Sequence, residues 1–96
     1  MKVGMLMDVM GGTQAQYDAA MLTIGLTSGS ETQPWPKGLI THTAGPIDGG
    51  WRVVDVWESK EDAKKFFDER LGAAIHASGM PEAQPQFFPV YNVHTA

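Results

Sequence analysis

The stretch that decides the fold spans residues 49–59, where a predicted strand runs directly into a capped helix. It reads Gly49-Gly50-Trp51-Arg52-Val53-Val54-Asp55-Val56-Trp57-Glu58-Ser59. Side chains of a strand alternate between two faces. One face of this strand therefore carries Trp51, Val53, Asp55 and Trp57, and the other carries Val54 and Val56. A face that mixes indole rings with a carboxylate is typical of a pocket wall, whereas the valine face predicts ordinary core against helices.

The residues before this stretch predict a strand, a helix, a long loop and a second strand. Residues 3–10 are apolar enough for a buried strand that ends at two glycines. Thr13 and Gln16 then form a capping-box pattern, which predicts a helix that ends at Gly25. Residues 27–37 form a polar loop in which Trp35 could close over a ligand. Residues 39–44 form the second strand, which pairs with residues 51–57 in a hairpin.

The residues after this stretch predict a long helix and a last strand. Ser59 caps the helix, and an apolar stripe at helical spacing carries it to Gly79. Aromatic and β-branched residues over 86–94 predict the last strand, in which Pro89 indicates an edge or a bulge.

The hairpin register decides which face of the sheet His42 occupies. If residues 46–49 form the loop, Ala44 faces Trp51, His42 faces Val53, and Ile40 faces Asp55. This register places His42 on the face of Asp55 and the tryptophans. A slip by one residue would move His42 to the opposite face.

The predicted order β-α-β-β-α-β describes an α+β ferredoxin-like sandwich in a single domain, residues 1–96, with a four-stranded antiparallel sheet and both helices on one face. The other face would expose Trp51, Trp57, Phe87 or Phe88, and Tyr91, which is more apolar area than a soluble monomer normally shows. We therefore expect two sheets to pack face to face in a homodimer, with a ligand cavity on that side.

Composition argues against several classes of protein. The formal charge of −4, from 11 acidic and 7 basic residues, argues against nucleic acid as a partner. No apolar run approaches the roughly 20 residues of a membrane span, and no signal segment opens the sequence, so the expected location is the cytoplasm. The chain has no cysteine, and its acidic residues and histidines show no metal-ligand spacing.

The sequence Val54-Asp55-Val56-Trp57-Glu58-Ser59, followed by Glu61-Asp62-Ala63 and Phe66, resembles the strand-to-helix signature of the dimeric α/β-barrel superfamily, and most closely its antibiotic biosynthesis monooxygenase-like domains. The resemblance implies a homodimer whose pockets lie between each sheet and its helices. Proteins of this kind include cofactor-independent quinone-forming monooxygenases, heme-degrading monooxygenases, polyketide cyclases and isomerases.

Similarity to the quinone-forming enzymes implies that Trp57 is a cavity residue. Val53 stands where some of those enzymes carry a cavity asparagine, so Asp55 and His42 would have to supply the polar chemistry. Similarity to the heme-degrading members implies a heme ligand at His76, on the second predicted helix. Against this, Phe66 or Phe67 replaces their helical tryptophan, and Met7 or Asp8 replaces their asparagine on the first strand.

Each candidate site residue also has a structural interpretation. His42 suits a general base because the pKa of an unperturbed imidazole lies near neutrality, but it could equally be a hydrogen-bonded strand residue. Asp55 could orient His42 or form a salt bridge with Arg52 or a lysine. The other candidates for contact with a substrate, which could equally pack in the core or in a dimer interface, are Trp57, Trp51, Tyr17, Trp35 and Tyr91. His76 lies beside the apolar stripe of its helix, where an exposed side chain is the simpler interpretation.

Taken with these residues, the resemblance implies a small-molecule-binding homodimer that acts without a cofactor on an aromatic or polyketide-like compound, as a monooxygenase, cyclase or isomerase. His42 would be the general base and Asp55 would orient it or compensate its charge. One alternative is a non-catalytic ligand-binding or dimerisation module. A further alternative is a heme-binding or heme-degrading protein that uses His76.

Overall fold

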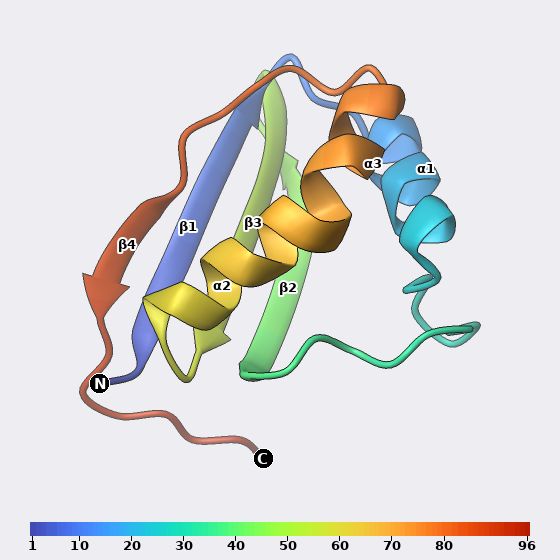
Figure 1. The fold of residues 1–96 in the computed structure, drawn as a ribbon. Coiled ribbons are helices and arrows are strands. Elements are labelled where there is room, and N and C mark those ends of the chain that lie inside the picture. Colours follow the sequence, from blue (N-terminus) through green and yellow to red (C-terminus); the bar gives the residue numbers. More distant parts are fainter.

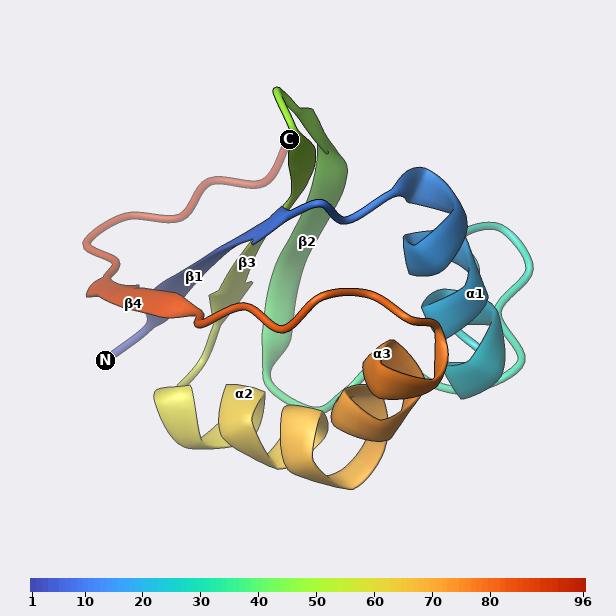
Figure 2. The same ribbon diagram turned by 90° about the horizontal axis from the view of Figure 1, so that it is seen from above.

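The computed structural model describes residues 1–96 and has the predicted order of elements (Figure 1). The elements in chain order are β1 (Val3–Met10), α1 (Gln14–Ile24), β2 (Leu39–Ile47), β3 (Gly50–Trp57), α2 (Lys60–Phe66), η1 (Phe67–Leu71), α3 (Gly72–Ala77) and β4 (Gln86–Pro89). All helices lie on one side of a single four-stranded sheet, which is plain when the molecule is seen from above (Figure 2). The α+β ferredoxin-like architecture is thus confirmed.

Local capping fixes the start of both helical regions as the sequence predicts. The Thr13 hydroxyl accepts a hydrogen bond from the backbone N–H of Gln16, and the Gln16 side chain accepts one from the Thr13 N–H. Gly25 ends α1 in the left-handed conformation, with φ of 77°. At the second helical region, the Ser59 hydroxyl accepts from the Asp62 N–H at 3.1 Å. These caps satisfy backbone groups that the first and last turns leave unpaired.

The strand order is β2-β3-β1-β4, and the strand pairs are antiparallel. β3 and β1 are central, so the strand that carries Asp55 is paired along both sides. Each edge strand contains a proline, Pro46 in β2 and Pro89 in β4. A proline is tolerated at an edge because it lacks the N–H that a central strand needs.

The predicted hairpin register is wrong by two residues, although the predicted face of His42 is right. β2 continues through Pro46 to Ile47, which pairs with Gly50, so a two-residue turn at Asp48 and Gly49 replaces the expected four-residue loop. His42 consequently pairs with Asp55 instead of Val53. A shift of two residues preserves the alternation of faces, so His42 still lies on the side of Asp55.

The prediction of which face the helices cover is wrong. Trp51, Val53, Asp55 and Trp57 are all buried beneath the helices, and Trp57 is only 2% exposed. Val54 and Val56 lie on the uncovered face and are partly buried. The indole rings offer far more apolar area than two valines, so covering the tryptophan face removes more apolar surface from water.

The second helical region has one irregularity that the apolar stripe did not predict. Between α2 and α3 the segment η1 is a π-helical turn, in which the Gly72 N–H donates to the Phe67 carbonyl five residues earlier. The wider turn keeps Phe66, Leu71 and Ile75 on the side that faces the sheet. The helix is otherwise as predicted, but Phe67, which the predicted stripe places inward, is 44% exposed.

The last strand is shorter than predicted, because β4 ends at Pro89 and not at His94. One further backbone hydrogen bond, from the Val90 N–H to the Lys2 carbonyl at 3.0 Å, follows the assigned strand. Residues 90–96 then run on the side of the sheet away from α2 and α3 (Figure 2). Tyr91 is fully exposed.

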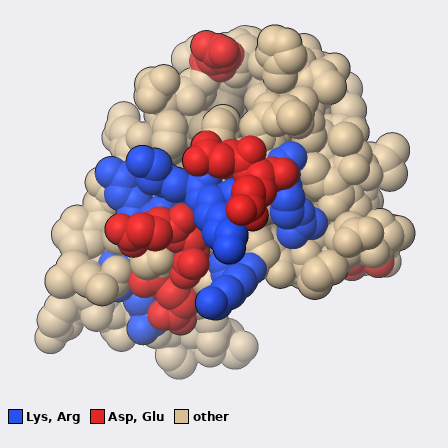
Figure 3. All heavy atoms as spheres, viewed as in Figure 1, with Lys and Arg blue, Asp and Glu red and all other residues tan.

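Charged side chains gather over the second helical region. Acidic and basic residues alternate in sign along residues 60–70, and Figure 3 shows them interleaved on this side of the molecule. Because the charges are interleaved, this surface has no broad region of positive or negative electrostatic potential. No helix is both long enough and apolar enough to cross a membrane.

Candidate active site

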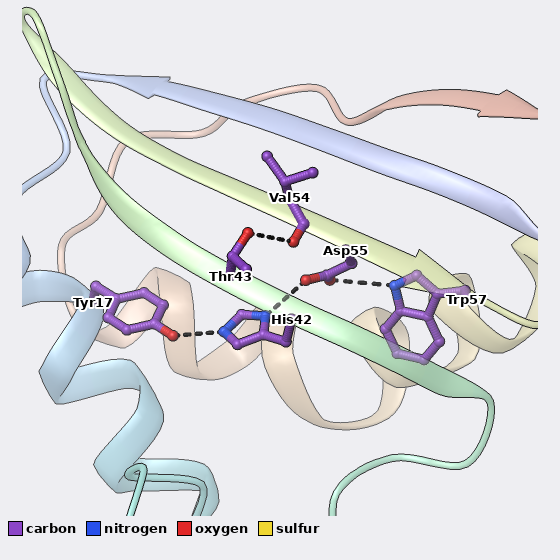
Figure 4. Close-up of polar contacts among 6 residues, drawn as sticks. All are labelled: Tyr17, His42, Thr43, Val54, Asp55 and Trp57. Carbon is purple, nitrogen blue, oxygen red and sulfur yellow. Dashed lines mark hydrogen bonds and ion pairs between the residues drawn. The ribbon is translucent and has the colours of Figure 1, made fainter. Parts of the chain in front are cut away.

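A chain of hydrogen bonds links four of the predicted site residues beneath the helices (Figure 4). The Tyr17 hydroxyl lies 2.6 Å from His42 Nε2, and His42 Nδ1 lies 2.7 Å from Asp55 Oδ1. The Trp57 indole N–H donates to Asp55 Oδ2 at 3.2 Å. The chain therefore runs from α1 through β2 to two positions of β3.

The carboxylate of Asp55 is buried but well satisfied. Asp55 is 5% exposed, and each of its two oxygens has a hydrogen-bond partner, His42 or Trp57. A buried carboxylate without partners would be strongly destabilising. The predicted alternative, a salt bridge to Arg52, is wrong: Arg52 lies on the opposite face and forms a bidentate pair with Asp8, at 2.6 and 2.8 Å.

Tyr17 stays protonated at neutral pH. Burial of its ring and the negative charges of Asp55 and Asp18 raise the pKa of Tyr17 to about 12. Its ring is almost parallel to the His42 imidazole, at 11°, and packs 5.3 Å from the Trp51 indole. These contacts hold the hydroxyl in place against His42.

A narrow cavity adjoins the hydrogen-bonded residues. Its volume is about 40 Å³, and 14 of its 16 lining residues are apolar; Tyr17, His42, Asp55 and Trp57 all contribute to its wall. By volume it has room for about two or three water molecules. The cavity lies between the sheet and the helices, as the family resemblance implied, and not on the uncovered face, as the strand pattern predicted.

A wider pocket of about 350 Å³ lies next to the narrow cavity. Asp55 and Trp57 line both spaces, together with Met5, Met7 and Phe66 among others. The wider pocket is within the range of about 300–1,000 Å³ that small-molecule sites occupy. Met5 and Met7 border both spaces, and methionine side chains adapt their shape easily.

Trp35 covers the narrow cavity from the loop between α1 and β2. Its ring lies 5.6 Å from the His42 ring, and its indole N–H donates to Glu31 at 3.3 Å. The residue is 38% exposed, so one side of it faces solvent while the other lines the cavity. The loop thus places Trp35 over the narrow cavity, and its contact with a ligand stays a prediction.

Three predicted candidates lie elsewhere. Trp51 is buried and packs against Tyr17, but it does not line the cavity. Tyr91 is exposed beyond the end of β4. His76 is exposed on α3 beside a separate pocket of about 340 Å³. His76 and Glu82 both line that pocket, whose volume is small for a heme macrocycle, so this space is a poor fit for heme.

The sequence interpretation did not connect Tyr17 with His42. It treated Tyr17 as a separate candidate, and it did not name Met5 or Met7 as cavity residues, although both line the two spaces. Alternation along β1 does place Met5 and Met7 on one face, and their pairing with Asp55 and Val53 in β3 follows from the antiparallel register. Nothing local to Tyr17 signals its contact with β2.

The sequence matches no protein-family model and no curated protein. Solved structures, however, share its fold over nearly the whole chain. A candidate antibiotic biosynthesis monooxygenase from Chloroflexus aurantiacus is 18% identical, with a TM-score of 0.66, over 99% of this chain and 98% of that one. SnoaB, a cofactor-independent oxygenase from Streptomyces nogalater, is 12% identical, with a TM-score of 0.62, over 96% and 95%.

A candidate antibiotic biosynthesis monooxygenase from Deinococcus radiodurans gives a TM-score of 0.58 at 8% identity, over 100% of this chain and 98% of that one. At such low identities the likeness is one of fold. The chain has the ferredoxin-like fold of the antibiotic biosynthesis monooxygenase-like proteins, and the resemblance carried by its strand-to-helix signature is confirmed at that level.

Proposed function

We propose that this protein is a homodimeric, cofactor-independent monooxygenase that acts on a polycyclic aromatic or polyketide-like phenol, with His42 as the general base. The observation that carries the proposal is the 2.7 Å contact between His42 Nδ1 and Asp55 Oδ1 at the wall of an apolar cavity. A buried carboxylate fixes the tautomer of its histidine and stabilises the imidazolium that forms when the histidine takes a proton.

The fold supports the class of reaction. SnoaB, which shares the fold, is a cofactor-independent oxygenase. In a reaction without a cofactor, the substrate itself must supply electrons to dioxygen, and it does so once it is a carbanion-like phenolate. Removal of the phenolic proton is therefore the step that a positioned base accelerates, typically by about 10²–10⁴-fold.

1-Naphthol illustrates the balance of the reaction. After His42 removes its proton, the carbon para to the oxygen attacks dioxygen, and the imidazolium returns the proton to the resulting peroxide. Loss of water then gives 1,4-naphthoquinone, so one naphthol and one dioxygen yield one quinone and one water. The wider pocket would hold the ring system, while the reacting hydroxyl enters the narrow cavity as Met5 and Met7 move.

The test uses 1-naphthol in air-saturated buffer. We expect the protein to consume oxygen and form quinone in equal amounts, and ¹⁸O₂ to place one heavy atom in the quinone. His42→Ala should lower kcat at least about 100-fold. His94→Ala is the matched control, because His94 is exposed and outside the site. Equal rates for wild type, His42→Ala and protein-free buffer would contradict the proposal.

A non-catalytic binding module is the second candidate, and the narrowness of the cavity beside His42 favours it. In that case 1-naphthol would quench the tryptophan fluorescence of the protein without being consumed. His42→Ala would then change the free energy of unfolding and the affinity, but no rate.

A further inference from the structure

We infer that Tyr17 is the catalytic residue that passes the substrate's proton to His42, so that His42 acts on a bound phenol through the Tyr17 hydroxyl. This inference rests on the proposed function and assigns a role to a residue that the mechanism above does not use.

The direction of each hydrogen bond follows from Asp55. Its carboxylate can only accept, and it faces both the Trp57 N–H and His42 Nδ1. In the neutral imidazole the proton therefore sits on Nδ1, and Nε2 carries the lone pair. The contact of 2.6 Å between Nε2 and the Tyr17 hydroxyl is then a bond in which Tyr17 donates.

This arrangement closes Nε2 to a ligand. An imidazole nitrogen has a single lone pair, and here the Tyr17 proton occupies it. The other ring nitrogen is held by Asp55. The only basic atom of the pair that can still accept a hydrogen bond is Tyr17 Oη, and Tyr17 lines the narrow cavity. A phenolic hydroxyl that enters this cavity from the wider pocket therefore has Tyr17 Oη as its acceptor.

The proton transfer then involves two protons that move together. The substrate hydroxyl gives its proton to Tyr17 Oη while Tyr17 gives its own proton to His42 Nε2, which leaves a phenolate and an imidazolium paired with Asp55. Tyr17 is a neutral phenol before and after the step. Its high pKa, caused by burial and by Asp55, keeps tyrosinate from accumulating.

Tyr17 also connects this pair with solvent. The residue lines a second, open pocket of about 190 Å³ on the surface, together with Asp18, Thr27 and Ser28. An imidazolium proton that is not returned to the product could leave by the reverse transfer, from Nε2 to Oη, as Tyr17 releases its own proton to water in that pocket. Tyr17 thus borders both the interior cavity and the open pocket.

The experiment compares Tyr17→Phe, His42→Ala and the double variant with 1-naphthol as the probe. Tyr91→Phe is the matched control, because Tyr91 is the only other tyrosine and is fully exposed. We expect Tyr17→Phe to lower kcat about 100-fold with little change in KM. The double variant should be no slower than His42→Ala, because residues that act as a unit are not additive. Circular dichroism confirms that each variant is folded.

Rates in mixtures of H₂O and D₂O give a readout that a purely structural role would not change. Two protons in flight predict a curved dependence of kcat on deuterium content for the wild type. The residual rate of Tyr17→Phe should depend linearly on deuterium content, since one proton then moves.

Two outcomes would overturn the inference. If Tyr17→Phe retains wild-type kcat while His42→Ala is inactive, His42 acts directly and the proposed function stands without the relay. Independently of any turnover, ¹⁵N NMR of the wild type must show the His42 proton on Nδ1. A neutral His42 protonated on Nε2 would reverse the hydrogen bond to Tyr17 and contradict the inference. Inactivity of every protein, the wild type included, would instead count against the proposed function.

Discussion

Asp55 is an aspartate in the middle of a buried strand, and it is tolerated there because neighbouring side chains donate hydrogen bonds to its carboxylate. Aspartate is disfavoured in strands, and burial of its charge is unfavourable without partners. In this protein β3 supplies the Trp57 N–H from two residues away, and β2 supplies His42 from the directly paired position. Both partners come from the sheet itself, so the geometry around the carboxylate is set by rigid elements and not by loops.

At the same scale, Tyr17 makes stability depend on pH in the alkaline range. The pKa of Tyr17 is raised from 10.0 to about 12 in the folded protein, so the folded state holds this proton more tightly than the unfolded chain. The stability that Tyr17 contributes is fully present below about pH 10 and is lost as the pH rises through 12. We expect the free energy of unfolding to fall more steeply over this range in the wild type than in Tyr17→Phe.

Urea denaturation at several pH values between 9 and 12 measures this difference. Tyr91→Phe serves again as the control and should follow the wild type, because its hydroxyl is exposed. Parallel curves for the wild type and Tyr17→Phe would show that the hydroxyl of Tyr17 is not buried in the folded protein.

At the scale of elements, the capping box of α1 makes a measurable contribution to the free energy of unfolding. Thr13→Ala removes the hydroxyl that accepts from the Gln16 N–H and should cost about 1 kcal/mol of the free energy of unfolding. Thr23→Ala is the matched control within the same helix, because the Thr23 hydroxyl donates back to the Ala19 carbonyl and caps nothing. Equal destabilisation by both substitutions, followed by chemical denaturation, would refute a special role for the cap.

The elements differ in how far the sequence alone predicts them. Caps at Thr13 and Ser59 and the strand-to-helix signature are local patterns, and the structure agrees with them. The two sets of side chains on β3 were also separated correctly. Alternation does not say which set the helices cover, because both sets are rich in apolar residues; the outcome depends on the area that each face can bury against α1 and α2.

The residues of the site also differ in whether local sequence patterns or long-range packing bring them together. His42 and Asp55 belong to adjacent strands, so a hairpin prediction that preserves the faces is enough to bring them together. Tyr17 reaches His42 across 25 residues and from a different layer of the fold. Helical spacing places Tyr17 on the inner side of α1, but only the packing of α1 on the sheet decides which strand residue it meets.

For the whole molecule, the uncovered face of the sheet leads us to expect a dimer. Leu6 and Val54 are paired across β1 and β3 on this face, and Phe88 of β4 lies over Gly4 with 43% of its surface exposed. Val54→Lys places a charge on a central strand of this face and should convert a dimer into a monomer. Light scattering after gel filtration reads the mass directly.

Leu22→Lys is the matched control for this test. Leu22 is an apolar residue on α1 that is 73% exposed, so its replacement by lysine changes charge and apolar surface on the helical side only. We expect Leu22→Lys to keep the mass of the wild type. A monomeric wild type, or a Val54→Lys variant that remains dimeric, would contradict packing through this face.

The prolines at the two rims of the sheet have a consequence for how copies of this chain can meet. Pro46 and Pro89 each remove an N–H from an outermost strand, so neither rim offers an unbroken row of donors to a foreign strand. The prolines therefore disfavour the addition of strands from other copies at the sheet edges, which is how fibrils grow. We therefore expect copies to associate through the flat of the sheet, where a two-fold contact would close on itself after two copies.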